Sequence, residues 1–295
     1  MKKLYLLIFC FTISFQSFSQ DIEDFVSKYT DENGHGYLQP MAEVFGANMN
    51  SGWYRDAYIN HKKFQIYFGL ITTTGLIKDN QKTFEGTTDY GEKVELPTIF
   101  GTNTPKRVEG PNGLAQNYPG GLSMSILPLA VPLLSVGGLY GTEAAVRFYA
   151  ADLGEDIGKI DLFGWGLRHS ISQYFEDIPV DIALGYYNQQ FSLTDHIDAN
   201  SSIISAQTGY RLGIIDFYGG VGYEFINMEF EYEIEEEDQS TTIQHDYKDL
   251  SSVRGTLGAM LNLGVFKLNM DYNLGKSNVF SLGLGFSFGN KRTSL

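Results

Sequence analysis

Cysteine is almost absent from this chain of 295 residues, because Cys10 is the only one. It lies in an apolar leading segment, so the rest of the chain carries no thiol. This absence excludes a disulfide framework, a thiolate metal site and a cysteine nucleophile.

Long apolar runs are also missing after the leading segment, and the mean hydropathy of the chain is -0.16. A membrane-spanning helix needs about 20 apolar residues, so a helical membrane fold is excluded. The only apolar run extends from Leu4 to Phe15, directly after Lys2 and Lys3. Residues 1–19 are therefore predicted to be a secretory signal peptide, with a signal anchor as the alternative.

Basic residues are scarce relative to acidic ones, with 21 Lys and Arg against 35 Asp and Glu, a net charge of -14. Removal of Lys2 and Lys3 with the signal makes it -16. Nucleic acid is not an expected partner, because binding it requires a basic surface. Residues 229–238, EFEYEIEEED, are typical of a solvated acidic loop, and weak binding of divalent cations there is the alternative.

What the chain does have is alternation, clearest in FSLGLGFSFG at 280–289. In a strand successive side chains point to opposite faces, so one face is apolar and the other carries only Gly and Ser. A soluble sandwich would cover its outer face with longer polar residues. The pattern predicts a transmembrane barrel strand with lipid outside and a crowded lumen inside. The apolar face consists of Phe280, Leu282, Leu284, Phe286 and Phe288.

The same alternation recurs in about ten segments between Phe64 and Phe288. It predicts an all-β fold, an antiparallel up-and-down transmembrane barrel over 61–290. Thr83-Phe84 and Val94-Leu96 could add a hairpin, so ten and twelve strands are both open. Connections at one end are expected to be short turns, and those at the other end, including 151–159, 191–201 and 235–248, longer loops.

Two segments do not fit the barrel pattern. Residues 123–134 contain Pro128 and Pro132, which cannot donate to a sheet, so a loop entering the barrel mouth is predicted. Residues 37–50 have apolar side chains at helical spacing with Pro40 in the first turn, which predicts a short amphipathic helix. This helix belongs to an N-terminal helical segment, 20–60, and lies on the membrane, caps the barrel or plugs it.

Three segments, YLQPMAEVFGANMNSGWY, LLSVGGLYGTEAAVRF and DLFGWGLRHSISQYF, resemble a family of outer-membrane proteins of Bacteroidota with no assigned activity. GTE-x-x-V-R-F at 141–148 and FGWGLRH at 163–169 are the most specific parts. The resemblance covers the chain after the signal and implies an outer-membrane β-barrel. A looser likeness to fatty-acid-type hydrophobic-compound transporters rests on the helical material before the barrel, but their Asn-Pro-Ala element is absent.

Charged residues on the inner strand faces are expected to form a salt-bridge network in the lumen, because an unpaired buried charge is costly. Glu143, Arg147 and Arg168 are predicted to meet across neighbouring strands and block the lumen. A network that fills a narrow barrel is favoured over a gated polar channel. The predicted set is Glu143, Arg147, Arg168, Asp181, Arg211, Asp216, Glu224, Arg254, Lys267 and Asp271.

Catalysis and cofactors are not expected, since GxGxxG, HExxH and CxxC motifs are all absent. His196 and His245 lie beside aspartates in predicted outer loops, which keeps an outer-membrane hydrolase as one alternative. A surface barrel that binds a ligand through its loops is the other. The favoured function is a non-enzymatic barrel in the outer membrane of a Gram-negative bacterium, structural or passing small apolar solutes. Its expected partners are membrane lipid, lipopolysaccharide and the barrel-insertion machinery.

The apolar face that ends at Phe288 is predicted to serve as the assembly signal read by the insertion machinery. Deletion of 290–295 should leave membrane insertion intact. Phe286→Asp combined with Phe288→Asp should abolish it, because charge replaces the lipid-facing end of the last strand. Outer-membrane fractionation of both variants checks this, and the opposite ranking would refute the assignment.

Overall fold

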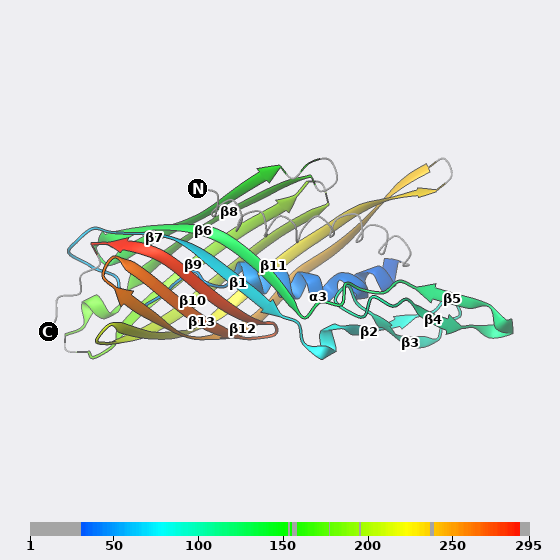
Figure 1. Ribbon diagram of the computed structural model, residues 1–295, viewed down its shortest axis with the longest axis horizontal. Helices are drawn as coiled ribbons and strands as arrows, with labels where there is room; N and C mark the ends of the chain where they lie inside the picture. Colours follow the sequence, from blue (N-terminus) through cyan, green and yellow to red (C-terminus); the bar gives the residue numbers. More distant parts are fainter. Residues whose placement is uncertain are drawn as a thin grey trace.

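The computed structural model describes residues 31–152, 154, 158–176, 178–194, 196–236 and 239–289. The predicted signal peptide lies outside these residues. Ten strands form one closed antiparallel barrel in the order β1-β14-β13-β12-β11-β10-β9-β8-β7-β6, which confirms the predicted fold class and the smaller of the two strand counts (Figure 1). The barrel strands are β1 (Gln65–Leu76), β6 (Ile126–Leu139), β7 (Thr142–Asp152), β8 (Lys159–Ser170), β9 (Asp181–Leu193), β10 (Ile197–Leu212), β11 (Ile215–Glu236), β12 (Gln239–Leu263), β13 (Phe266–Leu274) and β14 (Asn278–Phe288).

Side-chain direction follows the sequence alternation along the barrel wall. On β14, Phe280, Phe286 and Phe288 are exposed, whereas Ser281 and Ser287 are buried. Glycines fill the inner face where another group approaches; a Cβ on Gly285 would lie 2.6 Å from the hydroxyl of Tyr67. Closing β14 onto β1, with Phe286 opposite Phe68, brings the two ends of the barrel sequence together.

We call the two ends of the barrel the turn end and the arm end. The turn end is where β1 begins and β14 ends, and the arm end is where the β11–β12 hairpin and the strands between β1 and β6 project (Figure 1). The β6–β7, β10–β11 and β12–β13 turns at the turn end are short, as predicted, but the β8–β9 connection is a longer loop over 171–180 that contains a short helix. At the arm end the prediction of long loops is wrong for 191–201 and 235–248, because β9 runs to Leu193, β10 begins at Ile197 and β12 begins at Gln239.

The acidic run is part of that correction. β11 extends to Glu236, so most of 229–238 is strand rather than loop, with Glu229 opposite Asp246 and Glu236 opposite Gln239. The last two residues of the run lie outside the described residues. Among the described residues, no group of three or more His, Cys, Asp or Glu side chains could hold a metal ion. Weak binding of divalent cations there stays a prediction.

The prediction of a loop at 123–134 is also wrong, because residues 126–134 belong to β6. Pro128 and Pro132 stand opposite Thr74 and Leu70 of β1, in an unbroken register. A proline lacks a donor on only one side of a strand. The register shows that the other side, toward β1, is fully paired.

Between β1 and β6 the chain forms two small hairpins that are separate from the barrel. The hairpin expected around Thr83-Phe84 and Val94-Leu96 exists, but as its own two-stranded sheet rather than as barrel strands eleven and twelve. The elements of this segment are η1 (Asp79–Gln81), β2 (Thr83–Thr87), β3 (Lys93–Pro97), β4 (Lys106–Glu109), η2 (Pro111–Gly113) and β5 (Ala115–Tyr118), and a third short helix, η3 (Ser172–Tyr174), lies at the turn end.

Among the described residues, the α-helix α3 (Asp31–Met49) precedes the barrel. It begins six residues earlier than predicted, so Pro40 lies in its interior rather than in its first turn. No helix among the described residues has the length and hydropathy to cross a membrane. The helix lies at the arm end with its C-terminal half directed into the barrel (Figure 1), and Gly46 packs so closely on β11 that a Cβ would lie 2.3 Å from Ile226.

Candidate functional site

The lumen contains the N-terminal part of the chain. After α3, residues 50–60 continue inside the barrel, where Ser51, Trp53, Arg55 and Asp56 are all buried, and the chain becomes exposed again at 61–64, where β1 starts at the turn end. The chain therefore runs through the barrel from the arm end to the turn end. Residues 50–60 are not a β-strand but a single irregular stretch of chain inside the barrel, and we call this stretch the plug strand.

Two arginines of the barrel wall hold the end of α3. Arg147 on β7 donates to the backbone carbonyls of Met49 (3.4 Å) and Ser51 (2.9 Å). Arg254 on β12 donates to the carbonyl of Ala47 (2.9 Å) and to the Ser51 hydroxyl (2.8 Å). The last carbonyls of a helix have no partner within the helix and carry partial negative charge, so cations stabilise them.

Aromatic rings pack around the first of these arginines. The Arg147 guanidinium lies 3.9 Å from the centre of the Trp53 ring. Trp53 in turn stacks on Tyr187 of β9, with ring centres 5.1 Å apart. A cation over an indole ring away from water is attracted by about 2 kcal/mol, so Trp53 fixes the plug strand to the same side chain that binds the helix end.

An ion-paired network holds the plug strand just after Trp53, at Arg55 and Asp56. Glu143 on β7 pairs with Arg168 on β8 (2.9 Å) and with Arg55 of the plug strand (3.3 Å). Arg168 also pairs with Asp56 (3.1 Å). All four side chains are at most 4 % exposed. Two charges of each sign thus neutralise one another, which buried charges require.

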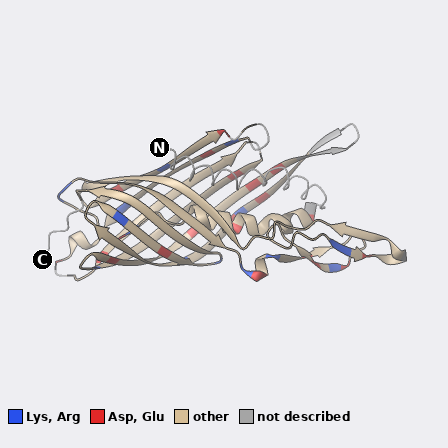
Figure 2. Cartoon of the chain, viewed as in Figure 1, with Lys and Arg blue, Asp and Glu red and all other residues tan. Residues whose placement is uncertain are grey.

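The predicted lumen residues all lie on inner strand faces, but in separate groups. Figure 2 shows charged residues of both signs distributed along the barrel strands. Glu224 pairs with Arg254 at 2.9 Å, and Arg211 pairs with Asp216 nearer the turn end. Lys267 donates to Asn262 (2.7 Å). Asp271 accepts from Tyr218 (3.0 Å) and Asn273 (2.6 Å), and Asp181 is buried.

One predicted contact is wrong. Glu143 and Arg168 meet, but Arg147 does not join them, and among the described residues no carboxylate lies within ion-pair distance of Arg147. Its partners are the end of α3 and Gln189 (3.2 Å). Inward parity was the correct signal, whereas Arg55 and Asp56 were missed because they lie in a segment with no strand alternation.

The interior changes character toward the arm end, where it is apolar. Buried side chains of α3, including Tyr37 and Phe45, pack against inner residues of β6, β8 and β9 and against Phe100 and Tyr118 from the segment between β1 and β6. Phe45 contacts Phe191 with ring centres 4.8 Å apart. The N-terminal segment inside the barrel therefore makes polar contacts in the middle of the lumen and apolar contacts, through α3, toward the arm end.

The histidines that kept a hydrolase open are not brought together. His196 is exposed at the β9–β10 turn. His245 is buried beneath α3, 2.9 Å from the hydroxyl of Tyr232. His169 bonds to Thr142 and Tyr174 at 2.8 Å each. These partners are hydroxyl groups, whereas a catalytic histidine base is oriented by a carboxylate.

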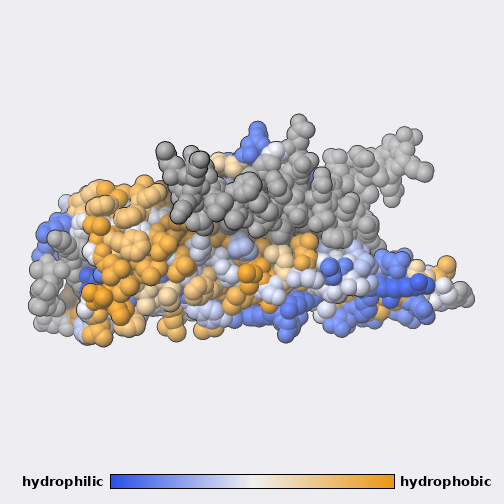
Figure 3. Space-filling view, viewed as in Figure 1, coloured by the Kyte–Doolittle hydropathy of each residue, from blue (hydrophilic) through white to orange (hydrophobic). Residues whose placement is uncertain are grey.

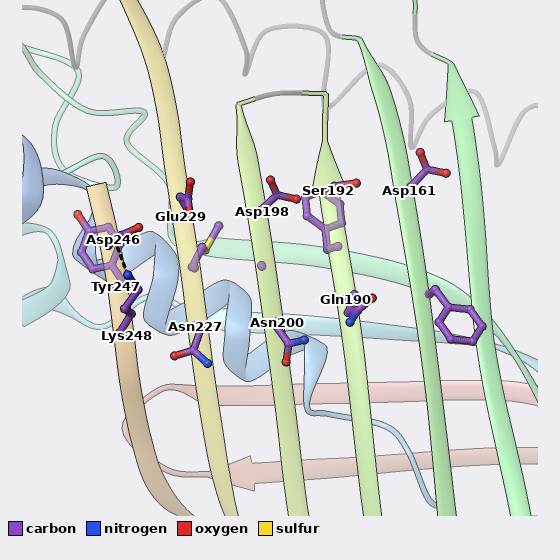
Figure 4. Close-up of a pocket in the computed structure, with 14 residues that line it drawn as sticks. Asp161, Gln190, Ser192, Asp198, Asn200, Asn227, Glu229, Asp246, Tyr247 and Lys248 are labelled. Carbon is purple, nitrogen blue, oxygen red and sulfur yellow. Dashed lines mark hydrogen bonds and ion pairs between the residues drawn. The ribbon is translucent and has the colours of Figure 1, made fainter. Parts of the chain in front are cut away.

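A shallow hollow of about 420 Å³ lies on the outer wall near the arm end. Figure 4 shows Asp161, Asp198, Glu229 and Asp246 along its rim, each on a different strand. From Asp161 toward the turn end, the next outward residues of β8 are Phe163, Trp165 and Leu167, and all three are exposed. The outer surface thus changes from apolar to acidic at this level. Figure 3 shows the same change from an apolar barrel surface to a hydrophilic arm end.

Comparison with known proteins gives a family and a set of distant structures. The profile described as "Family of unknown function (DUF6588)" matches residues 1–288. No curated protein matches the chain. This confirms the expected membership of a family without assigned activity, and the expected Bacteroidota source stays a prediction.

The solved structures are similar only at low identity. Ail, the attachment invasion locus protein of Yersinia pestis, is 11% identical with a TM-score of 0.30, covering 77% of this chain and 99% of that chain. OmpT, an outer membrane protein of Vibrio cholerae, is 11% identical with a TM-score of 0.29, covering 76% of this chain and 99% of that chain. The toluene transporter TbuX of Ralstonia pickettii is 8% identical with a TM-score of 0.28, covering 80% of this chain and 92% of that chain. Values this low transfer no role to this chain.

The geometry predicts that Arg147→Ala loosens the plug. Its bonds to two backbone carbonyls are lost, at a cost of about 2 kcal/mol, and no carboxylate among the described residues is left without its ion-pair partner. Ion conductance in planar bilayers should rise, because water can follow the loosened segment. Lys267→Ala is the matched control, since the described partner of this buried cation is Asn262, neither the plug strand nor a carboxylate. Equal conductance of the two variants would contradict this role of Arg147.

Proposed function

The chain belongs to that family of unknown function, and from its own geometry we propose that it is an outer-membrane barrel with a closed lumen that passes small apolar molecules. The observation that carries the proposal is the contrast inside the barrel. A polar, ion-paired plug crosses the middle, and an apolar interior built by α3 and β6 lies at the arm end.

The outer surface supports membrane insertion. Outward residues at corresponding positions of four consecutive strands are large, apolar and exposed: Leu167 on β8, Tyr186 on β9, Ile204 on β10 and Tyr223 on β11. Aromatic residues are enriched where a barrel meets the lipid headgroups. An exposed apolar band of this extent would be unfavourable in water. The acidic rim toward the arm end then lies in the aqueous phase.

The plug argues against a porin. A barrel of about eight strands is only wide enough for its own side chains, and here ten strands enclose a further segment of chain. The cavity beside Trp53, Tyr54 and Asp271 measures only about 10 Å³, the size of one water molecule. This space beside the plug strand is too small for a hydrated ion.

Apolar cargo suits the arm-end interior better than polar cargo does. Its side chains offer few hydrogen-bond partners, and a polar solute would lose its hydration there without compensation. Catalysis is not part of the proposal: His169 bonds to the hydroxyls of Thr142 and Tyr174, His245 bonds to that of Tyr232, and among the described residues no nucleophile and base are brought together around His196. A hydrolase would have to assemble its site from other residues.

A surface-binding role is the second candidate. It is favoured by the two hairpins β2–β3 and β4–β5 and by the long β11–β12 hairpin, which project beyond the barrel at the arm end (Figure 1). Replacing residues 109–115, the tip of the β4–β5 hairpin, by a short Gly-Ser linker tests this role and leaves Tyr118 in place. It should remove partner binding while leaving probe uptake intact if this hairpin acts as an adhesive element.

The proposal predicts opposite responses to two probes. Cells that carry the protein in their outer membrane should take up the apolar dye N-phenyl-1-naphthylamine faster than cells with an empty vector. Uptake of a charged dye of similar size should not change, because the ion-paired plug closes the lumen. Fluorescence of the two dyes in parallel cultures measures both rates.

Two results would contradict the proposal. Steady conductance of the size given by an open porin would show that the lumen is not closed. Equal uptake of the apolar dye with and without the protein would remove the transport role. The outer-membrane fraction must contain equal amounts of protein in each comparison.

A further inference from the structure

The barrel wall has one incomplete seam, between β6 and β7. Pairing of these strands includes Leu133 opposite Arg147 and continues toward the turn end. Toward the arm end, no pair of β6 and β7 residues among the described part of the chain is joined beyond that point. Both strands nevertheless continue, since β6 pairs with β1 up to Ile126 and β7 pairs with β8 up to Asp152.

Two prolines explain where the pairing stops. In an antiparallel strand, successive residues direct their N–H groups to opposite neighbours, so Pro128, Ala130 and Pro132 face the same side. The Ile77 N–H donates to the Ser125 carbonyl in continuation of the β1–β6 register, so odd-numbered residues of β6 bond to β1 and the missing donors of both prolines lie on the β7 side. The first unpaired position is Pro132. Of the three residues between 128 and 132 that face the seam, only Ala130 therefore has an N–H that the missing pairing leaves unsatisfied.

The seam joins two apolar environments. Pro132 and Phe148 face outward beside it, and Phe148 is 62 % exposed. Behind it, Leu129 and Val131 are buried in the apolar interior formed with α3. Toward the arm end of the seam, Ala150 stands opposite Asp161, which belongs to the acidic rim. The seam is therefore at the outer boundary of the apolar band.

We infer that the β6–β7 seam is a lateral opening through which small apolar molecules move between the arm-end interior and the adjoining lipid. This rests on the proposed function, because it gives the apolar cargo its route. A peptide strand is a poorer occupant, since the prolines deny it donors along one edge of the gap. Apolar molecules need no hydrogen bonds from either edge and cross from lipid to apolar side chains without passing through water.

Amide hydrogen exchange tests the seam directly. Continuing the register would place Ala130 opposite Ala150 and Pro128 opposite Asp152. The amides of Ala150 and Asp152 should therefore exchange quickly in the wild type, whereas those of Tyr149 and Ala151, which face β8, should be protected. Protection of all four amides in the wild type would overturn the opening.

A double variant should close the seam. Pro128→Val with Pro132→Val restores both donors toward β7, and exchange at Ala150 and Asp152 should slow by about tenfold. Uptake of N-phenyl-1-naphthylamine should then fall to the level of cells without the protein. Ala130→Val is the matched control, because it adds the same side chain at a position that already has an N–H, and it should retain uptake.

A disulfide provides a reversible version of the test. Ala130→Cys with Ala150→Cys places thiols at opposite positions of the gap in a chain whose only native cysteine is Cys10. Oxidation should abolish dye uptake, and reduction should restore it. Unchanged uptake in the oxidised protein, or in a double valine variant whose seam amides have become protected, would overturn the lateral route while leaving apolar transport intact. No uptake by the wild type would instead refute the proposed function itself.

Discussion

Buried guanidinium groups need partners, and this requirement organises the interior of the barrel. Arg147, Arg168 and Arg254 are each at most 2 % exposed. The barrel wall alone supplies Glu143 and Glu224 as their ion-pair partners. Gln189 and Gln207 of the wall add two amide acceptors. The N-terminal segment supplies the carboxylate of Asp56 and the last carbonyls of α3. Without that segment, these charges would draw water into the lumen, so the plug and the wall stabilise each other.

The sequence predicted the wall well because strand alternation is a local property. Parity alone assigned Glu143, Arg254 and Asp271 to the inner face and Phe280 and Phe288 to the outer face, and burial agrees for all five. Partner choice within the lumen is not local. Arg147 binds a helix end almost one hundred residues earlier in the chain, which no pattern within a strand encodes.

The predictions for 123–134 and 229–238 are wrong because each rests on an unfavourable feature of only one side of the strand. Proline was taken to exclude a strand, but it removes hydrogen bonding on one side only, and β6 needs only its β1 side along that stretch. Acidic repulsion favours a loop, but Glu229 and Glu231 alternate with Phe230 and Tyr232, which are buried in the apolar cluster formed with α3. Apolar packing on one face outweighed charge on the other.

Sealing and opening are placed at different heights of the same barrel. At the level of Glu143 and Arg147, β6 and β7 are paired and the plug is ion-paired to the wall, so both routes for water are closed. Nearer the arm end the β6–β7 pairing stops, and the interior behind it is apolar rather than charged. An unpaired wall is tolerable only there, because missing backbone bonds at the edge of the lipid can be met by water and headgroups. A gap beside the ion-paired network would instead expose buried charge to lipid, so the polar plug confines any lateral route to the arm-end half of the wall.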